Sequence, residues 1–257
     1  MTTQRIQQSA RKLHLSGLLR SLEVRLQEAV ANNLSHAEFL ELLFADEIAV
    51  RAQRALERRK KKAAFRDLRT LEDFDFSFNG SVKRSQIYDL ATCRFIAEGG
   101  DVLFIGPPGV GKSHLAQALG YQAVKNGHTV LYTSVFDLVR DLLAEEEIPG
   151  APSRLGHYLR CELLISDVMG LQQLPARSGE YLFEIIMRRY EKHSTIMTSN
   201  RPLEEWGKLV GDVPAATAIL DRFLHHAEIV QITAKSYRLK DRQQRASAGE
   251  GSKPTTK

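Results

Sequence analysis

The residues that decide the fold are Gly106-Pro107-Pro108-Gly109-Val110-Gly111-Lys112-Ser113, which match the pattern G-x-x-x-x-G-K-[ST] at every fixed position. The apolar run 101–105 precedes them and is typical of a buried parallel strand. Residues 113–126 follow with apolar side chains at helical spacing, and Gly127 stands where a helix C-cap is expected. Strand, glycine loop and helix in this order are the context that the phosphate-loop motif requires, so the sequence predicts such a loop.

The expected chemistry of this loop follows from its geometry. Glycines let successive backbone N–H groups face inward as an anion nest, and the helix N-terminus adds partial positive charge. Lys112 would then reach the β- and γ-phosphates, and the Ser113 hydroxyl would help to hold Mg²⁺. A glycine-rich turn that matches by chance is the alternative, which both flanks disfavour. We expect ATP and Mg²⁺ as cofactors, with the nucleotide held by Gly106, Pro107, Pro108, Gly109, Val110, Gly111, Lys112, Ser113 and His114.

Composition excludes several classes of protein. The 257 residues suffice for one ordinary domain and a smaller one, and 43% are hydrophobic, enough for a substantial core. The sequence has no run of 18 apolar residues and no apolar signal segment at its start, so we expect a cytoplasmic protein without a membrane partner. Cys93 and Cys161 form neither a disulfide framework nor a metal-ligand cluster, and we expect both in the core.

Positive charge is concentrated near the N-terminus. Residues 1–69 hold 14 Lys and Arg against 8 Asp and Glu, whereas the remainder is close to neutral and the whole chain carries +5. The same residues show helical periodicity, with a break predicted at Asn32-Asn33 and a capping box formed by Ser35 and Glu38. We therefore expect a basic helical domain over 1–69.

The end of this domain carries nine positive charges within 19 residues, opposed only by Glu57 and Asp67. A solvated charged face is one interpretation. Contact with the phosphate backbone of duplex DNA is the one that we favour, because such contacts release counterions and carry no base code. The candidate DNA-binding residues are Arg51, Arg54, Arg58, Arg59, Lys60, Lys61, Lys62 and Arg66.

The rest of the chain alternates between strand and helix patterns. Apolar strands are expected over 128–134, 163–167, 194–200 and 229–232, and helices over 136–147, 179–192 and 214–226. Before the phosphate loop, 73–78 alternates as a strand would and 84–97 is expected to be a helix. Pro149–Pro152 should break a helix, and the polar tail over 244–257 should be disordered.

Three polar residues at the ends of these elements are candidates for catalysis. Asp167 ends an apolar strand, where phosphate-loop enzymes place the carboxylate that orders Mg²⁺. The next residue is Val168, which can neither accept a proton nor orient a water molecule. Asn200 either hydrogen-bonds the γ-phosphate or forms a turn before Pro202. Arg222 either pairs with a neighbouring acid such as Asp221 or reaches the γ-phosphate of a neighbouring subunit.

Taken together, these segments resemble the IstB-like ATPases, which assist the transposases of certain bacterial insertion sequences and are related to helicase loaders and replication initiators. The resemblance rests on the basic helical N-terminus, residues 106–113 and 163–167, Thr198-Ser199-Asn200 and the run 219–223, and covers about residues 10–240. It implies an α/β fold of the AAA+ class, with a five-stranded parallel sheet flanked by helices, a small helical N-terminal domain and no C-terminal lid domain.

The resemblance also implies roles for individual residues. Lys112 and Ser113 are then the Walker A contacts, Asp167 the Walker B metal residue, Asn200 the sensor and Arg222 an arginine finger acting in trans. The implied assembly is a homo-oligomer on DNA with ATP at its subunit interfaces. At Val168 the family usually has an acid, and its loss is expected to slow hydrolysis by about 10²- to 10⁴-fold without preventing binding of Mg·ATP.

Three functions remain open to the sequence. The expected function is that of an ATPase that oligomerises on duplex target DNA and recruits or stimulates a transposase. Its ATPase domain is expected over 70–243. A helicase loader would use the same core with helices that hold a ring helicase, but the basic segment offers only Phe65 for stacking on single-stranded bases. A small-molecule kinase would have no need of the basic helical segment.

Overall fold

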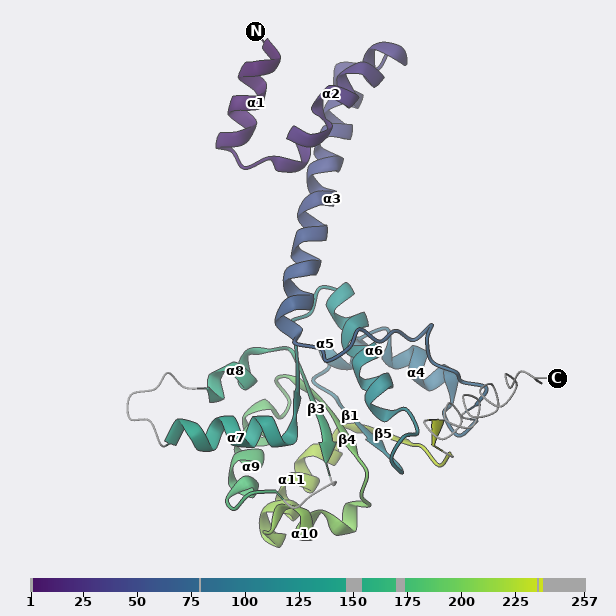
Figure 1. Ribbon diagram of the computed structural model, residues 1–257, viewed down its shortest axis with the longest axis vertical. Helices are drawn as coiled ribbons and strands as arrows, with labels where there is room; N and C mark the ends of the chain where they lie inside the picture. The colour runs from purple at the N-terminus through teal and green to yellow at the C-terminus, as the bar shows by residue number, and fades with distance from the viewer. Residues whose placement is uncertain (1, 79, 147–153, 170–173, 235, 238–257) are drawn as a thin grey trace, which may run out of the picture. The chain divides into compact units, whose positions relative to one another are not determined.

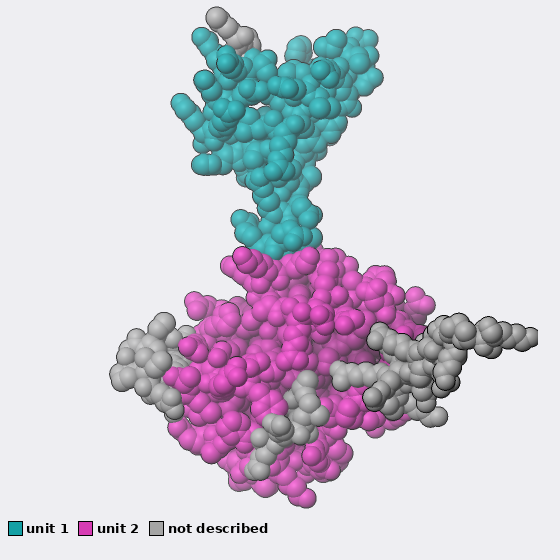
Figure 2. Space-filling view, viewed as in Figure 1, with its two compact units in different colours: residues 1–58 teal, residues 59–257 magenta. Residues whose placement is uncertain are grey.

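The computed structural model describes residues 2–78, 80–146, 154–169, 174–234 and 236–237 (Figure 1). It divides into two compact units, residues 1–58 and residues 59–257, which Figure 2 distinguishes by colour. The predicted helix break at 149–152 and the predicted tail over 244–257 lie outside the described residues. In the part of the chain that is described, no helix is both long enough and apolar enough to cross a membrane.

Unit 2 is built around five strands that are all parallel, in the order β2-β3-β4-β1-β5. The expectation of a five-stranded parallel sheet flanked by helices is confirmed. The strands are β1 (Asp101–Ile105), β2 (Val130–Ser134), β3 (Leu163–Met169), β4 (Ser194–Ser199) and β5 (Ala227–Gln231). The helices are α4 (Arg84–Leu90), α5 (Arg94–Ala97), α6 (Lys112–Lys125), α7 (Val135–Glu146), α8 (Leu155–Arg160), α9 (Ser178–Arg189), α10 (Trp206–Val210) and α11 (Val213–His225), with a 3-10 turn over Leu203–Glu205.

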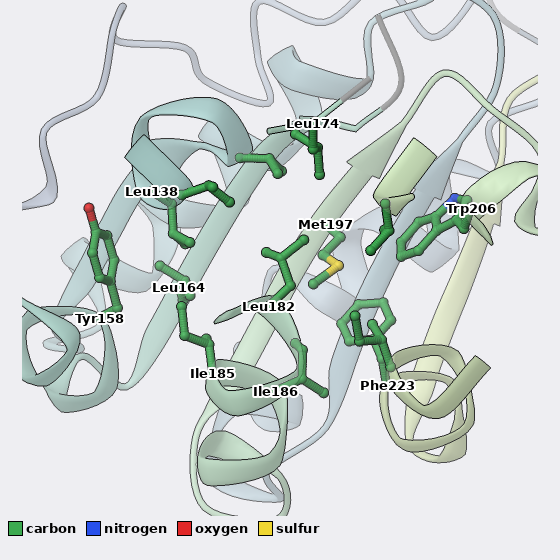
Figure 3. Close-up of a cluster of buried hydrophobic side chains, with 14 of the residues drawn as sticks. Leu138, Tyr158, Leu164, Leu174, Leu182, Ile185, Ile186, Met197, Trp206 and Phe223 are labelled. Carbon is green, nitrogen blue, oxygen red and sulfur yellow. The ribbon is translucent and has the colours of Figure 1, made fainter. Parts of the chain in front are cut away.

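Helices cover both faces of the sheet. On one face, α6 packs so closely that a Cβ at Gly120 would lie 2.4 Å from the Ile165 side chain. On the other face, side chains from α7 to α11 meet Leu103, Leu131, Leu164 and Met197 in a single buried cluster (Figure 3). Alternating strand residues point to opposite faces, so apolar residues at consecutive positions serve both layers. The sheet is therefore buried on both sides.

The segment before β1 differs from the prediction. Residues 73–78 form turns and not the predicted strand. The carboxylate of Asp75 accepts hydrogen bonds from the backbone N–H groups of Ser77 and Phe78, at 3.1 and 3.0 Å, so the chain folds back on itself. The helix predicted over 84–97 is instead two short helices, α4 and α5, separated by Cys93 in a left-handed conformation with φ of 62°.

Parallel strands bring their carboxyl ends to one edge of the sheet. The phosphate loop follows the carboxyl end of β1, Asp167 lies near that end of β3, and Asn200 follows β4. Because β4 is hydrogen-bonded to both β1 and β3, the three positions lie on neighbouring strands. Ligand sites of open α/β sheets lie at this edge.

Unit 1 consists of helices α1 (Thr2–Lys12), α2 (Ser16–Ala31) and the first part of α3 (His36–Ala63), which continues into unit 2. The predicted capping box begins α3: the Ser35 N–H donates to the Glu38 carboxylate at 2.7 Å, and the Glu38 N–H donates to the Ser35 hydroxyl at 3.3 Å. The predicted break between α2 and α3 is confirmed. The break at His14, with φ of 56°, was not predicted.

A buried carboxylate joins α2 to α3 within unit 1. Glu47 on α3 is 4% exposed and accepts hydrogen bonds from the backbone N–H groups of Gly17, at 2.6 Å, and Leu18, at 3.1 Å. Arg51 pairs with its other oxygen at 2.7 Å. Burial alone raises the pKa of Glu47, but Arg51 and the two N–H donors outweigh it, so this pKa lies below its usual value. Glu47 on α3 thus accepts two backbone N–H groups in the first turn of α2, which have no acceptor within their own helix.

We predict that Gly17→Ala destabilises unit 1 by about 1–3 kcal/mol, because the new methyl group would overpack the α2–α3 contact. A Cβ at Gly17 would lie 2.7 Å from the Glu47 Cα and 2.8 Å from the Asp46 carbonyl oxygen, both of which are backbone atoms. Hydrogen–deuterium exchange of the α2 amides measures the effect. Gly156→Ala on α8 is the control, since its nearest neighbouring atom is 3.7 Å away. Equal protection of α2 in wild type and Gly17→Ala would contradict the prediction.

Candidate nucleotide-binding site

The carboxylate of Asp167 is the centre of the candidate site. It is 2% exposed, and three hydroxyl groups donate hydrogen bonds to it. The Ser113 and Thr198 hydroxyls donate to Oδ1 at 2.8 and 2.6 Å, and the Tyr132 hydroxyl donates to Oδ2 at 2.5 Å. A buried carboxylate is thereby surrounded by hydrogen-bond donors from α6, β2 and β4.

Strand register explains this convergence. Ser166 pairs with Met197, which puts Thr198 beside Asp167, and Ser134 pairs with Asp167, which puts Tyr132 two residues back on the same face. Tyr132 belongs to no sequence motif, and its place beside Asp167 follows only from the pairing of β2 with β3. Burial raises the pKa of Tyr132 above its ordinary value, and the hydrogen bond to Asp167 raises it further, so the phenol remains a donor.

Within the phosphate loop, Lys112 is 5% exposed. Its Nζ donates to the carbonyl oxygens of Gly106 and Pro107, both at 2.7 Å, which holds the ammonium group against the loop. Gly109 and Gly111 have left-handed φ angles of 82° and 103°. A Cβ at Gly111 would also lie 2.6 Å from the ring of Phe74, so the loop depends on glycine there for two independent reasons.

The side chain of His114 faces the segment before β1. Its Nε2 lies 2.8 Å from the Thr70 carbonyl oxygen, and its ring meets that of Phe74 edge-on at 5.4 Å between centroids. Burial lowers the pKa of His114, which favours the neutral ring. Its backbone N–H belongs to the first turn of α6, where N–H groups have no acceptor within the helix. The expected contact of His114 with phosphate would therefore use its backbone.

Asn200 and Arg222 lie at opposite ends of the sheet. Asn200 is partly buried at the carboxyl end of β4. Arg222 is exposed near the end of α11, with its guanidinium 5.5 Å from the centroid of the Tyr190 ring and 4.0 Å from Asp221. Four residues after Arg222, the carbonyl oxygen of His226 accepts a hydrogen bond from the N–H of Asp101 at the start of β1. The structure thus brings Ser113 and Asp167 together and places Arg222 at the other end of β1 from the loop.

Val168 follows Asp167 within β3, and its side chain lies outside what the structure describes. The sequence nevertheless shows that residue 168 is a valine. No acidic side chain therefore follows Asp167 directly in β3.

The candidate DNA-binding residues lie on α3 and just after it. Arg51 is paired with Glu47, and Arg54 donates to the Ser16 hydroxyl, so these two contribute to the packing of unit 1. The others are distributed along the surface. Arg58, Lys61, Lys62 and Arg66 are exposed, and Arg59 and Lys60 are partly so.

Comparison with known proteins identifies the family. The sequence model of the family described as "IstB-like ATP binding protein" matches residues 8–245. The chain belongs to this family. The resemblance inferred from the motifs is therefore confirmed over nearly the whole chain.

Two curated relatives support the same assignment. This IstB-like chain is 36% identical to a protein of insertion sequence IS5376 from Geobacillus stearothermophilus, over 93% of this chain and 95% of the relative. It is 37% identical to the corresponding IS21 protein from Pseudomonas aeruginosa, over 95% and 91%. Among solved structures, DnaI matches with a TM-score of 0.53 and 23% identity, over 64% of this chain and 91% of that chain. That likeness concerns the fold alone.

We predict that Tyr132→Phe destabilises unit 2 by about 1.5–3 kcal/mol, because the buried Asp167 carboxylate loses one of its three donors. Urea unfolding followed by the fluorescence of Trp206, which is fully buried in unit 2, measures the change. Tyr121→Phe on α6 is the control, since this partly exposed ring contacts Lys125 through its face. Equal midpoints for wild type and Tyr132→Phe would show that the third donor is dispensable.

Proposed function

We propose that this IstB-like protein binds Mg·ATP at the carboxyl edge of its sheet and hydrolyses it as part of an oligomer on duplex DNA. The observation that carries the proposal is the 2.8 Å separation between the Ser113 hydroxyl oxygen and Asp167 Oδ1. With Mg·ATP bound, the Ser113 hydroxyl oxygen would bind the ion, and the Asp167 carboxylate that accepts this hydroxyl would order the ion and its water molecules. Both are hard oxygen donors, the type that Mg²⁺ prefers.

Each residue of the site would have a separate role in phosphoryl transfer. Backbone N–H groups at the start of α6 would bind the phosphates, and Lys112 would neutralise the β- and γ-phosphates. Asn200, at the same edge of the sheet, would hydrogen-bond the γ-phosphate or the attacking water. Bound Mg²⁺ would supply charge stabilisation, held by Ser113 and Asp167. With Val168 in place of an acid, the chain itself offers no base next to Asp167, so slow hydrolysis is expected.

Arg222 is proposed to act on a neighbouring subunit. Its position at the amino end of the sheet is separated from the phosphate loop of the same chain by the length of β1, five residues or about 13 Å. An arginine that supplies charge stabilisation in trans would couple ATP hydrolysis to assembly. The proposed oligomer therefore has ATP at its subunit interfaces.

The proposed biological role is that of a transposition helper that grips duplex target DNA and recruits or stimulates a transposase. The basic residues on and after α3 would contact DNA phosphates. The relatives at 36% and 37% identity belong to insertion sequences, which favours this role over that of a helicase loader. The likeness to DnaI supports the alternative only at the level of fold.

We predict that Lys112→Ala and Arg222→Ala each abolish DNA-stimulated ATP turnover, while their mixture recovers on the order of a quarter of the wild-type rate. In the mixture, an intact phosphate loop from one variant can meet an intact arginine from the other. Steady-state phosphate release with and without duplex DNA is the measurement, and a reaction without protein is the blank.

Arg188→Ala is the matched control for this experiment, because Arg188 is an exposed arginine on α9 paired with Glu184. It should turn over ATP as the wild type does. Two outcomes would contradict the proposal: a mixture no more active than its components, or ATP-dependent DNA binding by the wild type without any turnover above the blank.

We predict that Lys61→Ala with Lys62→Ala weakens binding to duplex DNA and reduces the slope of log K against log salt by about 1.8, since each lost phosphate contact contributes about 0.9. Fluorescence anisotropy over a salt series, with a non-hydrolysable ATP analogue present, gives the slope. The effect should be the same for unrelated DNA sequences, because phosphate contacts carry no base code.

The control is Arg94→Ala with Arg140→Ala, which removes the same net charge from exposed positions on α5 and α7. An equal reduction of the slope in both double variants would show a general charge effect and contradict the assignment. Tighter binding to single strands than to duplex, together with capture of a replicative helicase and not a transposase, would favour the loader.

A further inference from the structure

Two histidines and a glutamate form a cluster at the amino edge of the sheet, away from the phosphate loop. Glu191 lies in the turn after α9, and His225 and His226 end α11 just before β5. Each of the three offers one ligand atom, and these atoms lie within 4.8 Å of one another. Helices α9 and α11 pack side by side, which brings these segments together although they are 34 residues apart in sequence (Figure 1).

The backbones that carry the cluster are held in place. The His226 carbonyl oxygen accepts the N–H of Asp101 at 3.1 Å, which fixes the end of α11 to the start of β1. Glu191 has a left-handed φ of 56°, and Gly99 packs against its backbone, where a Cβ would lie 3.3 Å from the Glu191 carbonyl carbon. The three side chains therefore project from anchored positions, which reduces the entropy lost when a ligand binds them.

The side chains already converge. His226 Nε2 and Glu191 Oε1 are 3.2 Å apart, close to the separation of about 3.3 Å between two ligands at tetrahedral corners about 2.0 Å from Zn²⁺. The rings of His225 and His226 are 4.1 Å apart at their centroids. All three residues are exposed and thus accessible to an ion.

Neighbouring charges set limits on the affinity. The Tyr190 hydroxyl lies 2.7 Å from His225 Nδ1, and Arg222 lies over the Tyr190 ring. The positive guanidinium of Arg222 would repel a bound cation and lower its affinity. The Asp221 carboxylate, 4.0 Å from the guanidinium, reduces this repulsion. Two imidazoles and one carboxylate suit Zn²⁺, Cu²⁺ or Ni²⁺, whereas Mg²⁺ prefers ligands that are all oxygen.

We propose that Glu191, His225 and His226 form a binding site for a divalent transition-metal ion, with water completing the coordination. Zn²⁺ is the probe. The site is separate from the proposed Mg²⁺ position at Ser113 and Asp167, and its occupancy does not depend on nucleotide. Because Tyr190 contacts both His225 and Arg222, a bound ion would lie beside the proposed arginine finger.

Isothermal titration of the metal-free full chain with Zn²⁺, in excess Mg²⁺ and without nucleotide, tests the site. We expect one equivalent to bind, with affinity reduced at least tenfold in His226→Ala and in Glu191→Gln, as expected for loss of a ligand. His157→Ala, which removes an exposed histidine on α8, is the matched control and should bind as the wild type does. Circular dichroism of each variant establishes that it is folded.

Titration with Co²⁺ provides a second measurement that does not depend on a variant. Visible absorption typical of mixed nitrogen and oxygen coordination should develop up to one equivalent and disappear on addition of Zn²⁺. Less than half an equivalent of bound Zn²⁺ would overturn the proposal. So would Zn²⁺ binding of equal affinity in wild type, His226→Ala and Glu191→Gln, since the ion would then lie elsewhere.

Discussion

The buried carboxylate of Asp167 is the constraint on which the rest of unit 2 depends. Its three hydroxyl donors come from α6, β2 and β4, so one side chain connects the phosphate loop to three adjacent strands. The Ser113 hydroxyl can keep donating its proton to Asp167 while its oxygen lone pairs face an ion. The proposed metal position and the integrity of the sheet edge thus rely on the same atoms, and nucleotide binding would require little rearrangement there.

Much of the fold could be predicted because the sheet is buried on both faces. Short apolar runs that end at glycine or polar residues predicted all five strands, and the capping box of Ser35 predicted the start of α3. The segment 73–78 was predicted wrongly because its alternating pattern also suits a turn, and the outcome was decided by the carboxylate of Asp75 as a local acceptor. The break at Cys93 carried no glycine or proline to signal it.

Only part of the candidate site could be predicted from the sequence. Motifs that are typical of nucleotide binding contain Lys112, Ser113 and Asp167, so the roles of these residues could be predicted. Tyr132 belongs to none, because its role arises from the register of β2 against β3. The cluster of Glu191, His225 and His226 was missed for a similar reason: its members are joined by the packing of α9 on α11, which no local pattern encodes. The position of Arg222 at the amino edge likewise required the topology.

In the proposed oligomer, Arg222 and the phosphate loop, which lie at opposite ends of β1, would be two unlike halves of a catalytic centre. With the arginine acting in trans, subunits would associate head to tail, and the interface would be heterologous. An open row of n subunits would then contain n − 1 complete centres, since one terminal loop would lack an arginine and one terminal arginine would lack a loop. Turnover per chain would rise with the length of the row, so the assembly could report how much DNA it covers.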